Sequence, residues 1–494
     1  MKTGVKVFLY LGMFFVVIAC STASPDESDF DSLEEVGREI EHEADAAVGE
    51  ETLDTESEPA DETEESPQDD DAALPDEIGD GEEDDVFSDE AGSDADEMPD
   101  DDAPTLCDYK CPFDIEPRRT VLGIPASGEV DATLALWAVL DDGSTPYPQY
   151  LTSEASWSSL DPGIVTVDAA GVLTPVTPGK TFVRADYQGH HAYAEVIVAG
   201  TLYAGSITHD LRKRTYLLYV PEVYDGVIPL PLVLGLHGGS GTALGHMRMS
   251  QLNRAAHDHG FFAVYPDGAT LIQTWNGGNC CGKAAENKID DVGFIRKLID
   301  KIADDYAIDR KRVYTSGFSN GGIMSHRLAC EAADVIAAAA PLSGGINLGG
   351  DFTVCAPSRP MPIIMFHGTT DENYPIEGGI GDGLSGVDFY PVVHPTDPDT
   401  LSDWLTLNNA VEPGLVTYQK GDATCTTYSG DAPVVMCIID PQSPLSDGEV
   451  TYDGGGHAYP GGMRNHVYKQ ADVPSKDIDA NEAMWEFFSA HTLP

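Results

Sequence analysis

The chain has 494 residues and carries 84 Asp or Glu against 27 Lys or Arg, which gives a formal net charge of −57. So much negative charge repels a phosphate backbone, and the composition therefore excludes nucleic acid from the expected partners. The length is sufficient for more than one folded domain.

The first residues have the layout of a bacterial export signal. Two lysines precede an apolar run from Val7 to Ala19, which is too short to cross a membrane as a helix. The run ends in "VIAC", which resembles a bacterial lipobox, so we expect a signal peptide over 1–19 and a lipid on Cys20. An ordinary signal peptide with an incidental cysteine is the alternative. Because Ser21 follows the cysteine, the resemblance implies a surface protein that is held to the outer membrane by its lipid alone.

An acidic segment follows the signal. Residues 21–102 hold 37 Asp or Glu and one basic residue, Arg38, and so account for 36 of the 57 net negative charges. They have no sustained apolar period and cannot bury enough surface to offset the entropy of ordering. Cation binding is an alternative, but the irregular spacing is not that of an EF-hand loop. We expect a disordered tether over 20–105.

The composition changes at about Phe113. Short alternating runs such as "ATLALWAVL", "IVTVD" and "AYAEVIV" follow one another, each bounded by Gly, Pro or Asp. The stretch from "ASWSS" to "AEVIV", with Trp157 and the centre "IVTVDAAGVLTPVTPG", resembles the bacterial Ig-like domain of group 2. We expect a small all-β sandwich over 113–200. The fold alone does not say whether this domain acts as a spacer or binds a ligand.

From residue 201 to residue 494 the pattern becomes an alternation of strands and helices. The continuous apolar runs "LPLVLGLHGG", "FFAVYPDG" and "MPIIMFHG" are typical of buried parallel strands. In "DDVGFIRKLIDKIADDY", apolar residues recur at helical spacing and Asp290 is placed to cap the helix. The region is therefore predicted to be one α/β domain with a mostly parallel sheet, whose ligands bind at the carboxyl ends of the strands.

Three residues that can carry chemistry follow predicted strands. Ser319, in "TSGFSNGGIM", lies where a strand turns into a helix, and the glycines around it permit a sharp turn. Asp371 follows "PIIMFHGTT", and His457 lies in "YDGGGHAYPGG". The order Ser, Asp, His and the pattern G-x-S-x-G are those of an α/β-hydrolase. Singly, each has a plainer interpretation: a helix-capping serine, a turn aspartate and a loop histidine.

The sequence also predicts an oxyanion hole. "LGLHGGSGTA" follows the first strongly apolar strand and resembles the loop that supplies backbone donors in this fold. We expect amides near Gly239 and of Asn320 to point at one position. His237 is interpreted as support for this loop and not as a base.

Residues 201–494 resemble the esterase family that contains poly(3-hydroxybutyrate) depolymerases and bacterial feruloyl esterases, near carbohydrate esterase family 1. The motifs are "LHGG", "YPDG", "TWNGGNCCGKAAENKIDDVGFIRKLID", "RVYTSGFSNGGIMSHRLAC", "FHGTTDENYPIEGG" and "GGGHAYPGG". The resemblance implies Ser319 as nucleophile, Asp371 and His457 as its partners, and no metal or organic cofactor. It also implies an ester-bearing polymer or oligomer as substrate, either a plant polysaccharide or a polyester. The chain departs from the family between Ile380 and Thr396.

The acyl group is not fixed by these motifs. Trp275, Tyr374 and Tyr459 are placed to stack on a feruloyl group, although loop packing explains them equally well. A polyhydroxyalkanoate depolymerase is the first alternative function. A prolyl-oligopeptidase-type peptidase is less favoured, because that group tends to carry an aromatic residue where this chain has Asn320. A non-catalytic adhesin is disfavoured by the complete set of Ser, Asp and His.

Eight cysteines remain after Cys20, and an even number in an exported chain predicts disulfides. They are Cys107, Cys111, Cys280, Cys281, Cys330, Cys355, Cys425 and Cys437. The last two flank a predicted hairpin, and the pairs 330–355 and 107–111 are the next natural ones. The adjacent cysteines 280 and 281 either bridge each other or exchange partners with 330 and 355. Zinc is disfavoured because the spacings match no common zinc pattern.

Overall fold

The computed structural model describes residues 104, 111–128, 130–141, 149–381, 393–394, 396–441, 454–464 and 473–494. The expected signal peptide with Cys20, nearly all of the acidic tether, and Cys107 lie outside these residues, as does most of the insert before Thr396. The described residues all belong to one compact unit. Among the residues described, no helix is long and apolar enough to cross a membrane.

In the first part of this unit, the regular elements among the described residues are all strands, as the alternating pattern predicts. One small sheet contains β1 (Phe113–Glu116), β4 (Trp137–Leu140) and β5 (Gln149–Tyr150), and another contains β3 (Leu134–Ala135), β8 (Val172–Pro175) and β7 (Val165–Val167). The remaining strands are β2 (Arg119–Pro125), β6 (Ser156–Ser159), β9 (Gly179–Tyr187) and the start of β10 (His190–His209). We call residues 111–200 the β module. Its core contains fully buried residues such as Leu136, Val165 and Leu173.

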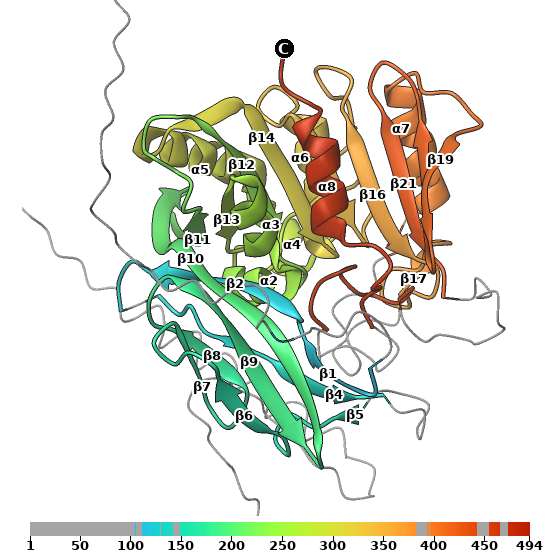
Figure 1. The fold of residues 1–494 in the computed structure, drawn as a ribbon. Helices are drawn as coiled ribbons and strands as arrows, with labels where there is room; N and C mark the ends of the chain where they lie inside the picture. Colours follow the sequence, from blue (N-terminus) through green and yellow to red (C-terminus); the bar gives the residue numbers. More distant parts are fainter. Residues whose placement is uncertain are drawn as a thin grey trace, which may run out of the picture. The chain divides into compact units, whose positions relative to one another are not determined.

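Strand β10 belongs to two parts of the molecule. Residues from His190 to Val198 pair with β9, and residues from Thr201 to His209 pair with β11 (Arg212–Val220). β2 runs parallel to β10, with a register shift between Val198 and Thr201. Gly200, at the shift, has a φ of 70°, which glycine adopts without strain. The boundary expected between residues 200 and 201 therefore lies inside one continuous strand, visible in Figure 1.

The second part is an α/β-hydrolase fold. After β10 and β11 its strand order is β13 (Phe262–Pro266), β12 (Leu230–Leu236), β14 (Ile308–Phe318), β15 (Ala338–Leu342), β16 (Ile363–Gly368) and β21 (Val434–Ile439). These six strands pair in parallel, and the antiparallel β20 (Ala423–Tyr428) and β19 (Leu415–Lys420) close the edge. β12, β13, β15 and β16 are almost entirely buried because helices cover both faces, which confirms the parallel sheet predicted from the apolar runs.

Two groups of helices cover the two faces of the sheet (Figure 1). The first group is α5 (Asp291–Asp305), α6 (Asn320–Glu331) and α7 (Asp397–Leu407), and the second is α2 (Ala243–Ser250), α3 (Leu252–His259) and α8 (Ala480–Ser489). A short α4 (Gly282–Glu286) precedes α5. Asp290 caps α5 by accepting a hydrogen bond from the amide of Gly293 at 2.8 Å, as its position in the sequence predicts.

Three disulfides link described cysteines. Cys425 bridges to Cys437 across β20 and β21, where the two residues are directly opposite, and Cys330 bridges to Cys355. Cys280 bridges to its neighbour Cys281, so the vicinal alternative holds. Cys111 is also disulfide-bonded. The described cysteines therefore offer no thiolate to zinc.

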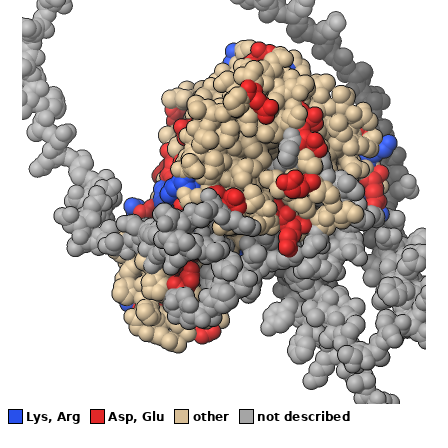
Figure 2. Space-filling view, turned by 90° about the vertical axis from the view of Figure 1, so that its right-hand side faces the viewer, with Lys and Arg blue, Asp and Glu red and all other residues tan. Residues whose placement is uncertain are grey.

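Acidic side chains are scattered over the surface. On the face shown in Figure 2, Asp and Glu appear at several separate places, with few Lys or Arg among them. Many are paired where they meet a basic residue, for example Asp334 with Arg296 at 2.6 Å. Such exposed pairs contribute about 1 kcal/mol or less each.

Candidate active site

The turn around Ser319 is held in a strained conformation. Ser319 lies between β14 and α6 and has φ 57° and ψ −120°, which a residue with a side chain rarely adopts. Its amide donates to the carbonyl oxygen of Leu342 at 2.9 Å, and its side chain makes no capping hydrogen bond to α6. The helix-cap interpretation is therefore wrong. We call residues 317–321 the elbow.

The elbow needs its glycines for steric reasons. A Cβ at Gly317 would collide with the backbone of Gly321, and a Cβ at Gly321 would collide with the backbone of Leu236 in β12. Strand and helix therefore approach each other more closely than any side chain would allow. This close approach brings the serine to the carboxyl end of β14.

Asp371 and His457 form a buried hydrogen-bonded pair. His457 Nδ1 lies 2.7 Å from Asp371 Oδ2, and the two residues are 2% and 4% exposed. Asp371 Oδ1 accepts from the amides of Asn373 and Tyr374 at 2.9 and 2.8 Å, and His367 Nε2 lies 3.4 Å from Oδ2. The carboxylate is thus held from both sides, and it fixes the orientation of the imidazole.

The environment of Asp371 favours its charged form. Burial raises the pKa of this carboxyl, but the charge of His457 and the hydrogen bonds from His367 and His457 lower it by more. The net result is a pKa well below the ordinary value for aspartate. Asp371 is therefore an anion at neutral pH and can stabilise a positive charge on His457.

His457 is carried by a glycine-rich segment, residues 454–464, which we call the histidine loop. Its ring centroid lies 4.6 Å from that of Phe318, the residue before Ser319, so the loop passes next to the elbow. Gly454 and Gly455 have φ values of 89° and 84°, and the carbonyl of Gly455 accepts from the amide of Thr370 at 2.7 Å. The loop is therefore fastened to the turn that carries Asp371.

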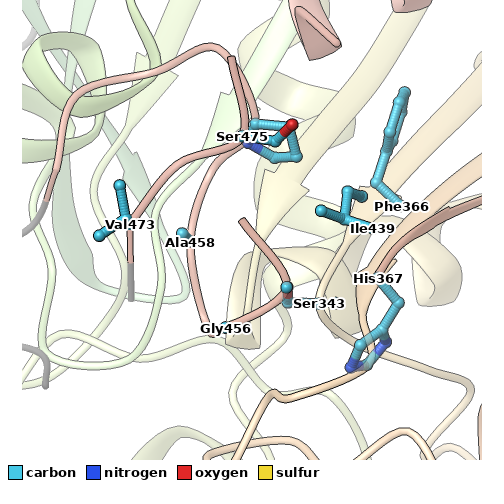
Figure 3. Close-up of a pocket in the computed structure, with 11 residues that line it drawn as sticks. Ser343, Phe366, His367, Ile439, Gly456, Ala458, Val473 and Ser475 are labelled. Atoms are coloured by element: carbon cyan, nitrogen blue, oxygen red, sulfur yellow. The ribbon is translucent and has the colours of Figure 1, made fainter. Parts of the chain in front are cut away.

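A small cavity lies behind the histidine loop (Figure 3). Ser343 after β15, Phe366 and His367 of β16, and Ile439 of β21 line it from the sheet. Gly455, Gly456, Ala458, Pro460, Val473 and Ser475 line it from the other side. The cavity lies at the carboxyl ends of these strands, where ligands of α/β sheets collect.

The loop predicted to form the oxyanion hole passes over the elbow. A Cβ at Gly238 would lie 3.4 Å from the Cβ of Ser319, and one at Gly239 would lie 3.9 Å from the Cβ of Asn320. His237 supports this loop, because its Nε2 accepts from the amide of Gly268 at 2.8 Å and its Nδ1 lies 2.7 Å from the carbonyl of Gly238. Burial lowers the pKa of His237 to about 4, so it stays neutral. This environment fits a supporting role and not that of a base.

The side chain of Asn320 has a role that the sequence did not reveal. Its Oδ1 accepts from the amide of Trp275 at 2.7 Å, and its Nδ2 donates to the carbonyl of Trp275 at 3.1 Å. Trp275 Nε1 in turn donates to the carbonyl of His237 at 2.9 Å. The residue after the serine thus fastens the oxyanion loop to the elbow. Only the adjacency of Asn320 to Ser319 could have suggested this, because Trp275 lies 45 residues away in the chain.

The three aromatic residues expected to stack on an acyl group are buried. Trp275, Tyr374 and Tyr459 are 0%, 2% and 1% exposed. Tyr374 Oη accepts from Asn347 Nδ2 at 3.1 Å, and Tyr459 Oη donates to Asn481 Oδ1 at 2.9 Å. Since none of them offers a ring face to a ligand, their geometry favours the loop-packing interpretation.

One group of described side chains brings three potential metal ligands within 4.8 Å of one another. His209, Asp210 and Asp290 lie at the hairpin between β10 and β11 and at the start of α5, with both carboxylates exposed. It shares no residue with the elbow or with the Asp371–His457 pair.

Comparison with known proteins points to esterases. A 269-residue match to the protein named feruloyl esterase B from Piromyces equi is 32% identical and covers 53% of this chain and 46% of that one. A 285-residue match to feruloyl esterase C from Emericella nidulans is 27% identical and covers 57% of this chain and 86% of that one. The structure of an acetyl xylan esterase from Aspergillus awamori matches 50% of this chain and 96% of its own, with a TM-score of 0.37 and 15% identity.

No protein-family model matches the chain. The chain spans less than half the length of the first of these relatives. The relatives are named esterases, and their similarity supports the carboxylic ester hydrolase class that the sequence indicates.

Proposed function

We propose that this protein is a serine ester hydrolase that releases acyl groups from polymer-linked esters by way of an acyl-enzyme on Ser319. The observation that carries the proposal is the strained elbow beside the hydrogen-bonded pair of Asp371 and His457. Catalysis by a serine requires a base next to it and a group that orients the base.

In the proposed reaction, His457 takes the proton of Ser319 as the oxygen attacks the ester carbonyl. Asp371 holds Nδ1–H of the imidazole and stabilises the cation that forms. The amides near Gly239 and of Asn320 bind the oxyanion. The C–O bond of the ester then breaks and the leaving alcohol receives the proton from His457. Water attacks the acyl-enzyme in the same way and releases the acid.

For the substrate we propose acyl esters on plant polysaccharides, either hydroxycinnamoyl or acetyl. The relatives named feruloyl esterase, and a further relative named bifunctional acetylxylan esterase/xylanase from Neocallimastix patriciarum, support this choice over a polyester. The buried aromatic residues do not select between the two acyl groups, because none of them is open to a ring.

The test compares the purified chain with its Ser319→Ala variant on four substrates: methyl ferulate, acetylated xylan, 3-hydroxybutyrate oligomers and a proline-containing peptide. The expected result is release of ferulate or acetate by the unaltered chain only. Cleavage of the oligomers alone would make the protein a polyester depolymerase, and cleavage of the peptide alone would make it a peptidase. Equal activity in the variant would remove Ser319 from the mechanism.

We also propose that the protein is exported and held at the bacterial surface by a lipid on Cys20. The lipobox-like sequence supports the anchor, and the disulfides suit an oxidising compartment. Cells fed a palmitate analogue should label the full chain and not a Cys20→Ala variant. Equal labelling of both would remove the anchor.

A further inference from the structure

The histidine loop ends inside the core of the β module. The side chain of Met463 is 7% exposed and joins the cluster that contains Leu136 and Val165. Its amide donates to the carbonyl of Met249 at 2.8 Å, and its sulfur accepts from Gln251 Nε2 at 3.3 Å. A residue six positions after His457 is thus packed between the β module and the end of α2.

The next residue makes a second contact with the β module. Arg464 donates to Tyr150 Oη at 2.8 Å, and its guanidinium carbon lies 4.9 Å from the centre of the Tyr150 ring. Arg464 is 8% exposed, so this cation–π contact is well shielded from water. Further along the chain, Lys476 Nζ lies 3.1 Å from Oε1 of Glu116 in β1.

The other side of the site is attached to the same module. α2 begins directly after the oxyanion loop, and Arg248 in its last turn donates to the carbonyl and the hydroxyl of Thr133, each at 2.8 Å. Gln251, which ends α2, accepts from the hydroxyl of Thr120 at 2.6 Å. Both contacts run from the oxyanion side of the site to strands or turns of the β module.

The histidine loop requires such anchors. It contains Gly454, Gly455 and Gly461, all with positive φ, and glycine restricts the backbone less than any other residue. A loop of this composition keeps one shape only if its ends are fixed by other parts of the fold.

We infer that the β module acts as a positioning element of the active site, because it fixes the histidine loop through Met463 and Arg464, and fixes α2, which follows the oxyanion loop, through Arg248. Met463, Arg464 and Arg248 are positioning residues. They touch no reacting atom and act through the residues that do. The inference rests on the proposed roles of His457 and the oxyanion loop.

The experiment compares two substitutions that each create a cavity in the core of the β module. Met463→Ala removes a side chain supplied by the histidine loop, whereas Val165→Ala removes one supplied by β7, which among the described strands pairs with β8 alone. With p-nitrophenyl acetate, we expect Met463→Ala to lower kcat roughly tenfold with KM within about twofold, since misplacement of catalytic groups reduces transition-state stabilisation. Val165→Ala should keep kcat within about twofold, and Met463→Leu should restore most of the loss.

Tyr150→Phe is the milder second variant and keeps the ring but not the hydroxyl that Arg464 reaches. We expect this variant to have a severalfold lower kcat at an unchanged melting midpoint. If Met463→Ala does not fold, the kcat of Tyr150→Phe decides whether the inference stands. Equal loss of kcat in Met463→Ala and Val165→Ala, or full activity in both Met463→Ala and Tyr150→Phe, would overturn the inference. If the unaltered chain and Ser319→Ala are equally active, the proposed function fails instead.

Discussion

The elbow and the histidine loop lie side by side, since the rings of Phe318 and His457 are 4.6 Å apart, yet they keep their shapes by different means. The elbow is fixed by steric contacts within the sheet, where Gly317 and Gly321 meet the backbones of neighbouring segments. The histidine loop is fixed by side chains from far along the chain, namely Asp371 at one end and the β module at the other. A local sequence pattern can therefore specify the first but not the second.

Removing the nucleophile should have the largest effect. Ser319→Ala is expected to lower kcat by about 10⁵-fold or more, as loss of a serine nucleophile does in related mechanisms. The fold should be unchanged, because the side chain makes no capping hydrogen bond. Ester hydrolysis and a circular dichroism spectrum measure the two outcomes. Retained activity with normal folding would mean that another group is acylated.

Changing the anchor at the start of the histidine loop should have the second largest effect. Asp371→Asn keeps the shape of the side chain but can donate where Asp371 accepts, so His457 would take the wrong tautomer. We expect kcat to fall by about 10⁴-fold. A steady-state assay at pH 7 and at pH 8 measures it. A loss below tenfold would show that a different group orients His457.

Adding one methyl group to the elbow tests its steric basis. Gly321→Ala places a Cβ against the backbone of Leu236, which cannot move without distorting β12. We expect a loss of unfolding free energy of about 2 kcal/mol or more together with a large loss of kcat. Gly226→Ala is a useful comparison, because a Cβ there meets nothing, although its φ of 82° still imposes some strain. Equal stability of the two variants would contradict the steric account.

A change of pH should have a smaller effect, and it should act on the free energy of unfolding through a buried histidine of α6. His326 in α6 accepts a hydrogen bond on Nδ1 from Trp404 Nε1 at 3.0 Å, and its Nε2 lies 3.0 Å from the carbonyl of Gly344. Burial lowers the pKa of His326 to about 3, although the hydrogen bond to the Gly344 carbonyl acts in the opposite direction. The folded protein therefore keeps this ring neutral, whereas the unfolded chain protonates it below about pH 6.5.

The unfolded state thus binds more protons between about pH 3 and pH 6.5, and stability falls as the pH drops through that range. From pH 7 to pH 5, His326 alone should cost about 2 kcal/mol of unfolding free energy. Urea denaturation of the unaltered chain and of His326→Gln, at both pH values, isolates this contribution. The variant should lose about 2 kcal/mol less over the same interval. An identical pH dependence in both proteins would show that His326 is not the group responsible.

Sequence reasoning was most reliable where the determinants are local. The G-x-S-x-G pattern between a strand and a helix, the cap at Asp290 and the hairpin disulfide of Cys425 and Cys437 all depend on residues close in the chain. The α/β-hydrolase sheet was also predictable, because its strands are continuous apolar runs.

Three features could not be obtained in this way. The buried Trp275 exchanges two hydrogen bonds with Asn320 and donates one to the carbonyl of His237, contacts that no spacing reveals. The packing of Met463 in the β module joins segments about 300 residues apart. The third is the course of β10 through residue 200, because the change in composition there accompanies a change in burial pattern and not an end of the strand.

β10, which pairs with both β9 and β11, also limits how such a protein can be rearranged by recombination. A crossover near residue 200, where the composition suggests a domain junction, would cut β10 between its pairing with β9 and its pairing with β11. β2 would then have to pair with both parents, because Arg119–Leu122 pair with β10 before the junction and Ile124 and Pro125 pair with Thr201 and Leu202 after it. A chimera that is meant to fold therefore needs its junction before β1, so that this module and the enzyme are inherited as a single piece.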